Sequence, residues 1–172
     1  MKKTVVLLLS LLLLAGCGYK PSAQLAKSVI GESVYVYVSM SRIDPQNTVL
    51  IKDAIQTAFV DRFGSKITSQ SEAAAILNVS LAGVDFSPLV YDANGYVISY
   101  RTIAKLKIDY ALSSGEKGSV ITKGEYDFPI EADSIISDTR RFEAIRYASA
   151  DAIDEFTAIV AIKGLQREQK QN

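Results

Sequence analysis

Three long segments of alternating side chains occupy the second half of this 172-residue chain and limit the folds open to it. They cover residues 74–91, 96–112 and 119–130. Asn94-Gly95 lies between the first and second segments, and the glycine-rich stretch 113–118 lies between the second and third. Asn-Gly and glycine-rich turns of this length are typical of β-hairpins. The segments are therefore predicted to form three consecutive antiparallel strands.

Alternation divides the side chains of these strands between two faces. In the middle segment one face carries Ile98, Tyr100, Ala104, Leu106, Ile108, Tyr110 and Leu112. Its other face carries Ser99, Arg101, Lys105, Lys107 and Asp109. The last segment repeats the pattern, with Val120, Tyr126, Phe128 and Ile130 facing inward and Lys123, Glu125 and Asp127 facing outward. One face of the sheet is predicted to be core and the other solvent-exposed, with a β-bulge at Gly83, where the apolar phase shifts.

Two segments with helical spacing can cover the apolar face. The first follows a cap at Asn47 or Thr48, ends at Gly64, and carries Ile51, Ile55, Ala58, Phe59 and Phe63. The second begins at Ser137 or Asp138, ends at Gly164, and carries Phe142, Ile145, Ala148, Ala152, Phe156 and Ile159. The solvent side of this second helix is expected to hold Asp151, Asp154 and Glu155. A further strand is predicted over residues 33–39, where Val34, Val36 and Val38 share one face.

The resulting order is β-α-β-β-β-α, and it predicts an α+β fold. We expect a two-layer sandwich, in which a mostly antiparallel four-stranded sheet is covered on one face by two helices. This single domain spans residues 33–164. Residues 17–32 are expected to be a lipidated N-terminus and tether with at most a short helical turn, and residues 165–172 a polar tail.

The N-terminus has the features of a secretory signal. Lys2 and Lys3 precede an apolar run from Val5 to Leu14, which as a helix would cover only about half of the ~30 Å hydrocarbon core of a bilayer. The next residues, Leu14-Ala15-Gly16-Cys17, resemble the lipobox that lipoprotein signal peptidase recognises. We therefore expect residues 1–16 to be removed and Cys17 to carry the lipid anchor; the alternative is ordinary secretion with an unmodified thiol.

The residue inventory argues against an enzyme. The chain has no histidine, and its single cysteine is Cys17, so Ser-His-Asp, Cys-His and imidazole metal sites are excluded, and neither a metal nor a cofactor is expected. Glu125 and Asp127 could act as a carboxylate pair, but beside Lys123 they are typical of a solvated strand face. Removing Lys2 and Lys3 leaves 17 basic against 19 acidic residues, a net charge of −2, which does not suggest nucleic-acid binding.

Several segments together resemble the LptE family of lipopolysaccharide-assembly lipoproteins. They are Cys17-Gly18-Tyr19-Lys20-Pro21, residues 44–54, the Asn94-Gly95 hairpin, Ile136-Ser137-Asp138 and the alanine-rich last helix. The resemblance covers nearly all of the mature chain. It implies an outer-membrane lipoprotein, lipid-anchored at the periplasmic leaflet, that plugs the β-barrel of the lipopolysaccharide translocon, assists its assembly and binds lipopolysaccharide.

The solvent-exposed sheet face offers cations for the phosphates of such a ligand, namely Arg101, Lys105, Lys107 and Lys123. Relatives place a basic residue just before the Asn-Gly turn, where this chain has Asp92 and Ala93, so that contact is not carried over. A solvated face without a ligand is one alternative, and a site near Arg140 and Arg141 is another. The alternative function is that of a periplasmic lipoprotein of the same architecture, with an envelope-maintenance binding role and no barrel partner.

Overall fold

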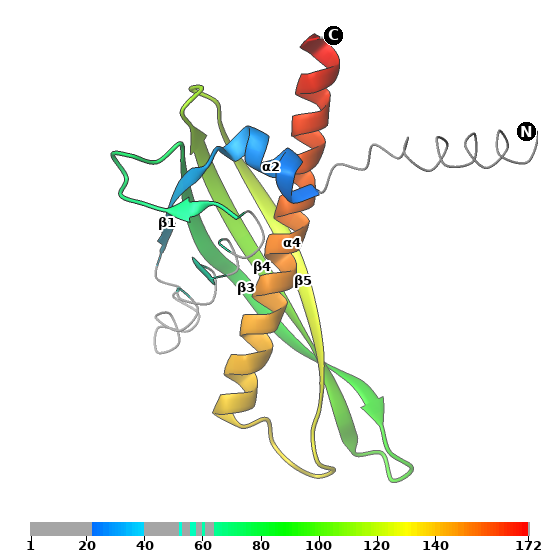
Figure 1. The fold of residues 1–172 in the computed structure, drawn as a ribbon. Helices are drawn as coiled ribbons and strands as arrows, with labels where there is room; N and C mark the ends of the chain where they lie inside the picture. The colour runs from blue at the N-terminus through cyan, green and yellow to red at the C-terminus, as the bar shows by residue number, and fades with distance from the viewer. Residues whose placement is uncertain (1–21, 40–51, 53–55, 58–59, 61–63, 172) are drawn as a thin grey trace, which may run out of the picture.

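The computed structural model describes residues 22–39, 52, 56–57, 60 and 64–171. Its elements, in chain order, are α2 (Ser22–Ile30), β1 (Ser33–Val38), β2 (Lys66–Ile67), β3 (Ala75–Tyr91), β4 (Val97–Leu112), β5 (Lys117–Pro129) and α4 (Asp138–Gln171). The strands form one sheet in the order β2-β1-β3-β4-β5, and α4 runs along one face of it (Figure 1). The predicted α+β two-layer sandwich is confirmed.

The three long strands and their hairpins are present as predicted. β3 pairs with β4, and β4 with β5, in antiparallel register. The two turns contain Gly95 and Gly115, each with φ of 87°, a backbone conformation that glycine adopts at little cost. The register of β3 shifts between Leu81 and Gly83, which confirms the bulge.

The division of side chains between the two sheet faces is also confirmed. Leu77, Leu106 and Ile108 are fully buried on the inward face, beneath α4. The core continues into α4 through Ile153 and Phe156, and into β1 through Val34. On the outward face, Lys105, Lys107 and Lys123 are exposed.

Helix α4 approaches β5 most closely at Gly124. A Cβ atom built on Gly124 would collide with the backbone of α4, at the Ala148 carbonyl oxygen and the Ala152 nitrogen. Ala148 and Ala152 are themselves fully buried. The absence of a side chain at residue 124 therefore lets the helix lie directly on the strand.

The structure differs from the prediction at the expected tether. Residues 22–30 form the helix α2, whose Leu25, Ala26 and Ile30 are buried in the common core. The helix ends at Gly31, which has φ of 93° and whose nitrogen donates to the Lys27 carbonyl oxygen at 2.7 Å. Residues 22–30 thus belong to the folded unit, which was expected to start at residue 33, because three apolar residues on one side of a short helix are enough to dock it.

The last helix is longer than predicted. Gly164 does not end α4, which continues to Gln171. A Cβ atom on Gly164 would lie 2.7 Å from the Leu25 carbonyl oxygen of α2. The glycine is therefore explained by the close approach of α2. Lys163, next to it, donates to the Tyr110 hydroxyl and holds this part of α4 against the sheet.

Two further differences concern the region between β1 and β3. The sheet has a fifth strand, β2, of two residues, and β1 is parallel to both of its neighbours. Two residues are too few for a recognisable alternation. The apolar residues of the helix expected between positions 48 and 63 lie outside the described residues. Gly64, its expected end, has φ of 57° and donates to the Val60 carbonyl oxygen at 2.9 Å, as a helix-ending glycine does.

Candidate ligand-binding face

The four predicted cations lie together on the outward face of β4 and β5, as their spacing indicated. Arg101, Lys105 and Lys107 come from β4, and Lys123 lies directly across from Lys105 on β5. We call this surface the outward face. Its side chains project away from α4 because the inward positions are filled by the core.

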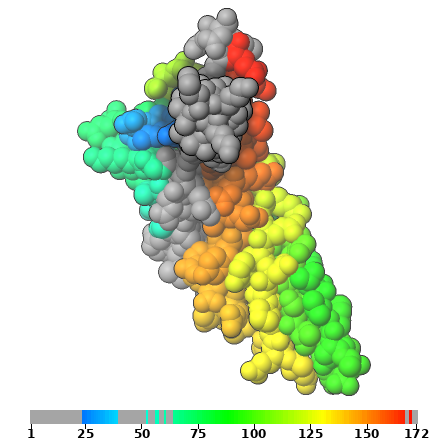
Figure 2. Space-filling model, turned by 45° about the vertical axis from the view of Figure 1, so that its right-hand side comes forward, coloured from blue at the N-terminus to red at the C-terminus, as the bar shows by residue number. Residues whose placement is uncertain are grey.

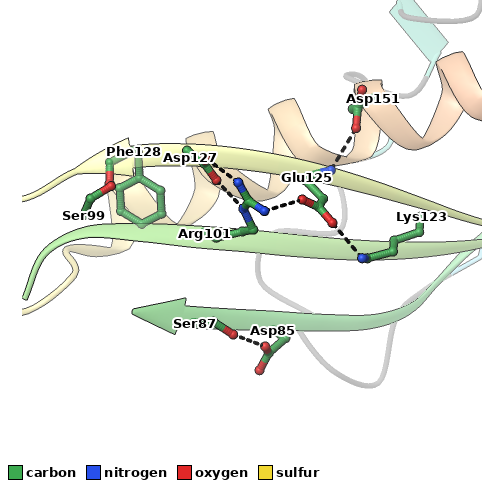
Figure 3. A network of polar contacts seen from close by, with 9 residues as sticks. All are labelled: Asp85, Ser87, Ser99, Arg101, Lys123, Glu125, Asp127, Phe128 and Asp151. Carbon is green, nitrogen blue, oxygen red and sulfur yellow. Dashed lines mark hydrogen bonds and ion pairs between the residues drawn. The ribbon is translucent and has the colours of Figure 1, made fainter. Parts of the chain in front are cut away.

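Arg101 is held by two carboxylates of β5 (Figure 3). Its Nε and Nη2 donate to the two oxygens of Asp127 at 2.7 and 2.8 Å, and its Nη1 lies 2.9 Å from Glu125 Oε2. Asp127 faces Arg101 directly in the register of the two strands, so the fork-shaped guanidinium meets both carboxylate oxygens. The arginine is therefore not a free cation.

Two of the three lysines are paired in the same way. Lys123 Nζ donates to Glu125 Oε1 at 2.6 Å, which extends the chain of contacts from Asp127 through Arg101 and Glu125. Lys107 Nζ lies 3.2 Å from Asp109 Oδ2. The contacts of Arg101 join neighbouring strands, and those of Lys107 and Lys123 join alternate residues of one strand. In both cases the side chains meet because they lie on the same face of the sheet.

The pairing changes the acid strength of these groups. The hydrogen bonds and charge of Arg101 lower the pKa of Asp127, and those of Lys123 lower the pKa of Glu125. The pKa of Asp109 is also lowered, first by a hydrogen bond from Ser119 and then by Lys107. All three carboxylates therefore stay ionised at neutral pH and keep neutralising the cations.

Lys105 is the exception among the four predicted cations, because it forms no ion pair with any described residue. It lies opposite Lys123, a like charge that repels it. Asp85 of β3, across from Ile103, adds a fourth carboxylate and accepts from Ser87 Oγ at 2.6 Å. The four predicted cations are thus matched by four carboxylates, so their part of the face is balanced rather than basic, and Lys105 is the cation among them that is left without an ion pair.

Asp151 and Glu155 of α4 make contacts that were not predicted from the sequence. Asp151 accepts a hydrogen bond from the Glu125 backbone nitrogen at 2.9 Å, and Glu155 accepts one from the Lys123 nitrogen at 2.6 Å. These N–H groups lie on the open edge of β5, where another strand could pair. The signal in the sequence was a pair of acids four residues apart on the last helix. Whether these acids face the edge strand depends on how α4 lies on the sheet.

Other kinds of site find little support in the described part of the chain. It contains no group of three or more side chains placed to hold a metal ion. A hollow of about 430 Å³ lies at the start of α4, lined by residues that include Ile130, Glu131, Ile135 and Arg140. Arg140 is 3.6 Å from Glu143. Cys17 lies outside the described residues.

A family model described as lipopolysaccharide-assembly, LptE, matches residues 35–158, which is more than half of the chain. The chain belongs to the LptE family. The match includes most of β1, all of β2 to β5 and the greater part of α4, and thus the whole outward face. Members of this family are lipoproteins of lipopolysaccharide transport and outer-membrane assembly. No helix among the described residues is long and apolar enough to cross a membrane.

Solved structures of bacterial lipoproteins are similar to this LptE-family chain over most of its length. Rare lipoprotein B from Shewanella oneidensis has 14% identity and a TM-score of 0.43, with 81% of this chain and 95% of that one covered. A lipoprotein from Caulobacter crescentus has 13% identity and a TM-score of 0.49, covering 83% and 98%. Lipoprotein B from Nitrosomonas europaea has 13% identity and a TM-score of 0.49, covering 79% and 88%. No curated protein sequence matches the chain.

Proposed function

We propose that this protein is a non-enzymatic outer-membrane lipoprotein that assists assembly of the lipopolysaccharide-translocating β-barrel, plugs that barrel and binds lipopolysaccharide during its delivery. The observation that carries the proposal is membership of the LptE family over residues 35–158. The three long strands, with one solvent-exposed face, support it, because a plug must present polar surface to a polar barrel lumen.

The anchor in this proposal is lipid on Cys17, at the periplasmic leaflet. A lipid-modified cysteine is the start of the mature chain, and each buried methylene of its acyl chains contributes about 0.8 kcal/mol to membrane binding. Cys17→Ser should abolish acyl labelling and leave an uncleaved precursor. Normal processing of this variant would contradict the lipobox assignment.

The proposed lipopolysaccharide contact is the outward face, through Arg101, Lys105, Lys107 and Lys123. Three of these cations are already paired, so a phosphate would share them with carboxylates and would gain most from Lys105, which has no ion pair among the described residues. Phosphate oxygens form charge-assisted hydrogen bonds with such groups, and binding of this kind weakens as salt is added.

The test of the contact is lipopolysaccharide binding by the detergent-solubilised lipidated protein at low salt. Lys105→Glu should weaken binding about tenfold, and Arg101→Glu/Lys105→Glu further, while the circular-dichroism melt stays near that of the wild type. Lys66→Glu is the control, because it reverses an exposed charge on β2, at the opposite edge of the sheet from β5. Unaltered binding by the folded double variant would move the site elsewhere, for instance toward Arg140 and Arg141.

The test of the partner is crosslinked co-purification from outer membranes. A β-barrel of outer-membrane type should be recovered in stoichiometric amount, and depletion of this protein should lower both folded barrel and surface lipopolysaccharide. A clean deletion that leaves both unchanged would favour a lipoprotein of the same architecture with another envelope function.

A further inference from the structure

Exposed apolar side chains gather at the free end of the β3–β4 hairpin. Leu89 and Val90 are 41% and 44% exposed, and Tyr91 and Tyr96 are 56% and 46% exposed. Ile135, in the loop between β5 and α4, is 92% exposed. Figure 2 shows the hairpin, in green, and this loop, in yellow, at the same end of the molecule. We call these five residues the hairpin end. A patch of this kind on a soluble domain marks a contact surface.

The hairpin end is a preformed surface. Asp92 Oδ1 accepts hydrogen bonds from the Asn94 and Tyr96 nitrogens at 2.9 and 2.8 Å. The Asp92 nitrogen donates to the Tyr96 carbonyl oxygen at 2.8 Å, and Gly95 supplies the positive φ that closes the turn. Because the turn is already ordered, a partner would not have to order it on binding, which lowers the entropic cost of association.

The hairpin end lies far from the start of the folded unit. Helix α2 packs on α4 at Gly164, whereas the hairpin end lies beyond the first turn of α4, at the opposite end (Figure 1). Asp138 and Gly164 are about 39 Å apart along a helix with a rise of 1.5 Å per residue. Ser22 is five residue steps from Cys17, and five steps span at most about 18 Å. A membrane that holds Cys17 therefore lies next to α2, away from the hairpin end.

The charges of the two segments disfavour an anionic lipid as the partner. Residues 89–96 and 130–136 contain Asp92, Glu131 and Asp133 and no lysine or arginine. Arg140 lines the same hollow as Ile135, but it is paired with Glu143 at 3.6 Å. The acidic residues therefore dominate, and phosphates of a glycolipid or phospholipid surface would be repelled there. An apolar surface with acidic neighbours is instead complementary to a protein surface that offers apolar side chains and cationic groups.

We infer that the hairpin end is the surface through which this chain docks on the protein wall of its barrel partner. This inference rests on the proposed function and adds the contact surface to it. Tyr91 and Tyr96 are the principal contacts, because tyrosine at an interface provides a large apolar area with few rotatable bonds.

The experiment is recovery of the barrel with the full lipidated chain, extracted in detergent from outer membranes and washed at high salt. Tyr91→Ser/Tyr96→Ser is compared with Tyr37→Ser/Ile162→Ser, a matched control that also removes two large apolar side chains, 53% and 55% exposed. Four proteins are compared: the wild type, the two double variants and Lys105→Glu. For each of them we measure the thermal melt by circular dichroism and, separately, the binding of lipopolysaccharide.

The amount of barrel recovered with the hairpin-end variant should be lower than with the wild type by a factor of at least about ten. The amount recovered with the control should stay within about twofold of the wild type. The melt and the lipopolysaccharide binding of the hairpin-end variant should match the wild type. Full retention of the barrel by the hairpin-end variant overturns the inference and leaves the proposed function standing. A parallel loss of lipopolysaccharide binding overturns it in favour of a glycolipid contact. A wild-type chain that recovers no barrel overturns both the inference and the proposed function.

Discussion

The two faces of the sheet are built on different kinds of contact. On the inward face, α4 lies so close to β5 that residue 124 has no room for a methyl group. On the outward face, Arg101, Lys123 and their carboxylate partners are between a third and a half exposed, so their ion pairs form in water. Close packing cannot adjust to an added atom, whereas solvated ion pairs can rearrange. The inward face should therefore govern stability, and the outward face remains available for binding.

Gly124→Ala should have the largest effect, because the new methyl group would collide with the backbone of α4 and neither element can move without disturbing the core. We expect the free energy of unfolding to fall by about 3 kcal/mol, measured by urea denaturation. The matched control is Gly83→Ala, at a site with open space around the added atom. The contrast between the faces fails if the two variants are equally stable.

Gly164→Ala tests whether α2 is held by close approach. Alanine favours a helix interior by about 1 kcal/mol over glycine, so the variant would be more stable if α2 were not in the way. The clash with the Leu25 carbonyl oxygen should reverse that sign and give a net loss of about 1 kcal/mol. Exchange of the backbone amide hydrogens should become faster in α2 and remain slow in β4. Gln166→Ala, on an exposed position of α4, is the control; a stabilised Gly164→Ala protein would contradict the docking.

Asp151→Ala/Glu155→Ala tests the edge between the two faces. Loss of both acceptors should cost about 1–2 kcal/mol and leave two N–H groups of β5 open to another strand. Sedimentation velocity should show concentration-dependent self-association that the wild type lacks. Glu131→Ala/Asp133→Asn also removes two carboxylates and should stay monomeric. Self-association in both variants would indicate an effect of net charge alone.

Acidification should have the smallest effect, and it acts on the outward face. The pKa values of Asp127 and Glu125 are lowered in the folded state. Their ion pairs therefore contribute fully to the stability of the fold above the ordinary pKa values of 3.8 and 4.5. This contribution is lost as the pH falls through the lowered pKa values. Between pH 6 and pH 3 the melting temperature of the wild type should fall more than that of Glu125→Gln/Asp127→Asn. Equal decreases would show that these pairs do not stabilise the fold.

Much of the fold could be predicted because its signals are local. Alternation over 16 residues of β4 assigns each side chain to a face, and the assignment holds from Arg101 to Leu112. The Asn94-Gly95 turn and the helix start at Ser137, whose Oγ accepts from the Arg140 nitrogen at 3.3 Å, are equally local. The shared parity of Arg101, Lys105, Lys107 and Lys123 follows from the same period of two.

The sequence by itself determined the long strands, their turns, the two faces and the polar or apolar character of each, because these depend on residues a few positions apart. The tertiary structure alone decided which cations are neutralised, since Arg101 meets Asp127 only through the β4–β5 register. It also decided that α2 docks at Gly164 and that Asp151 and Glu155 cover the β5 edge. These contacts join residues 26 to 139 positions apart, and no local pattern specifies a distance that the packing of α4 on the sheet creates.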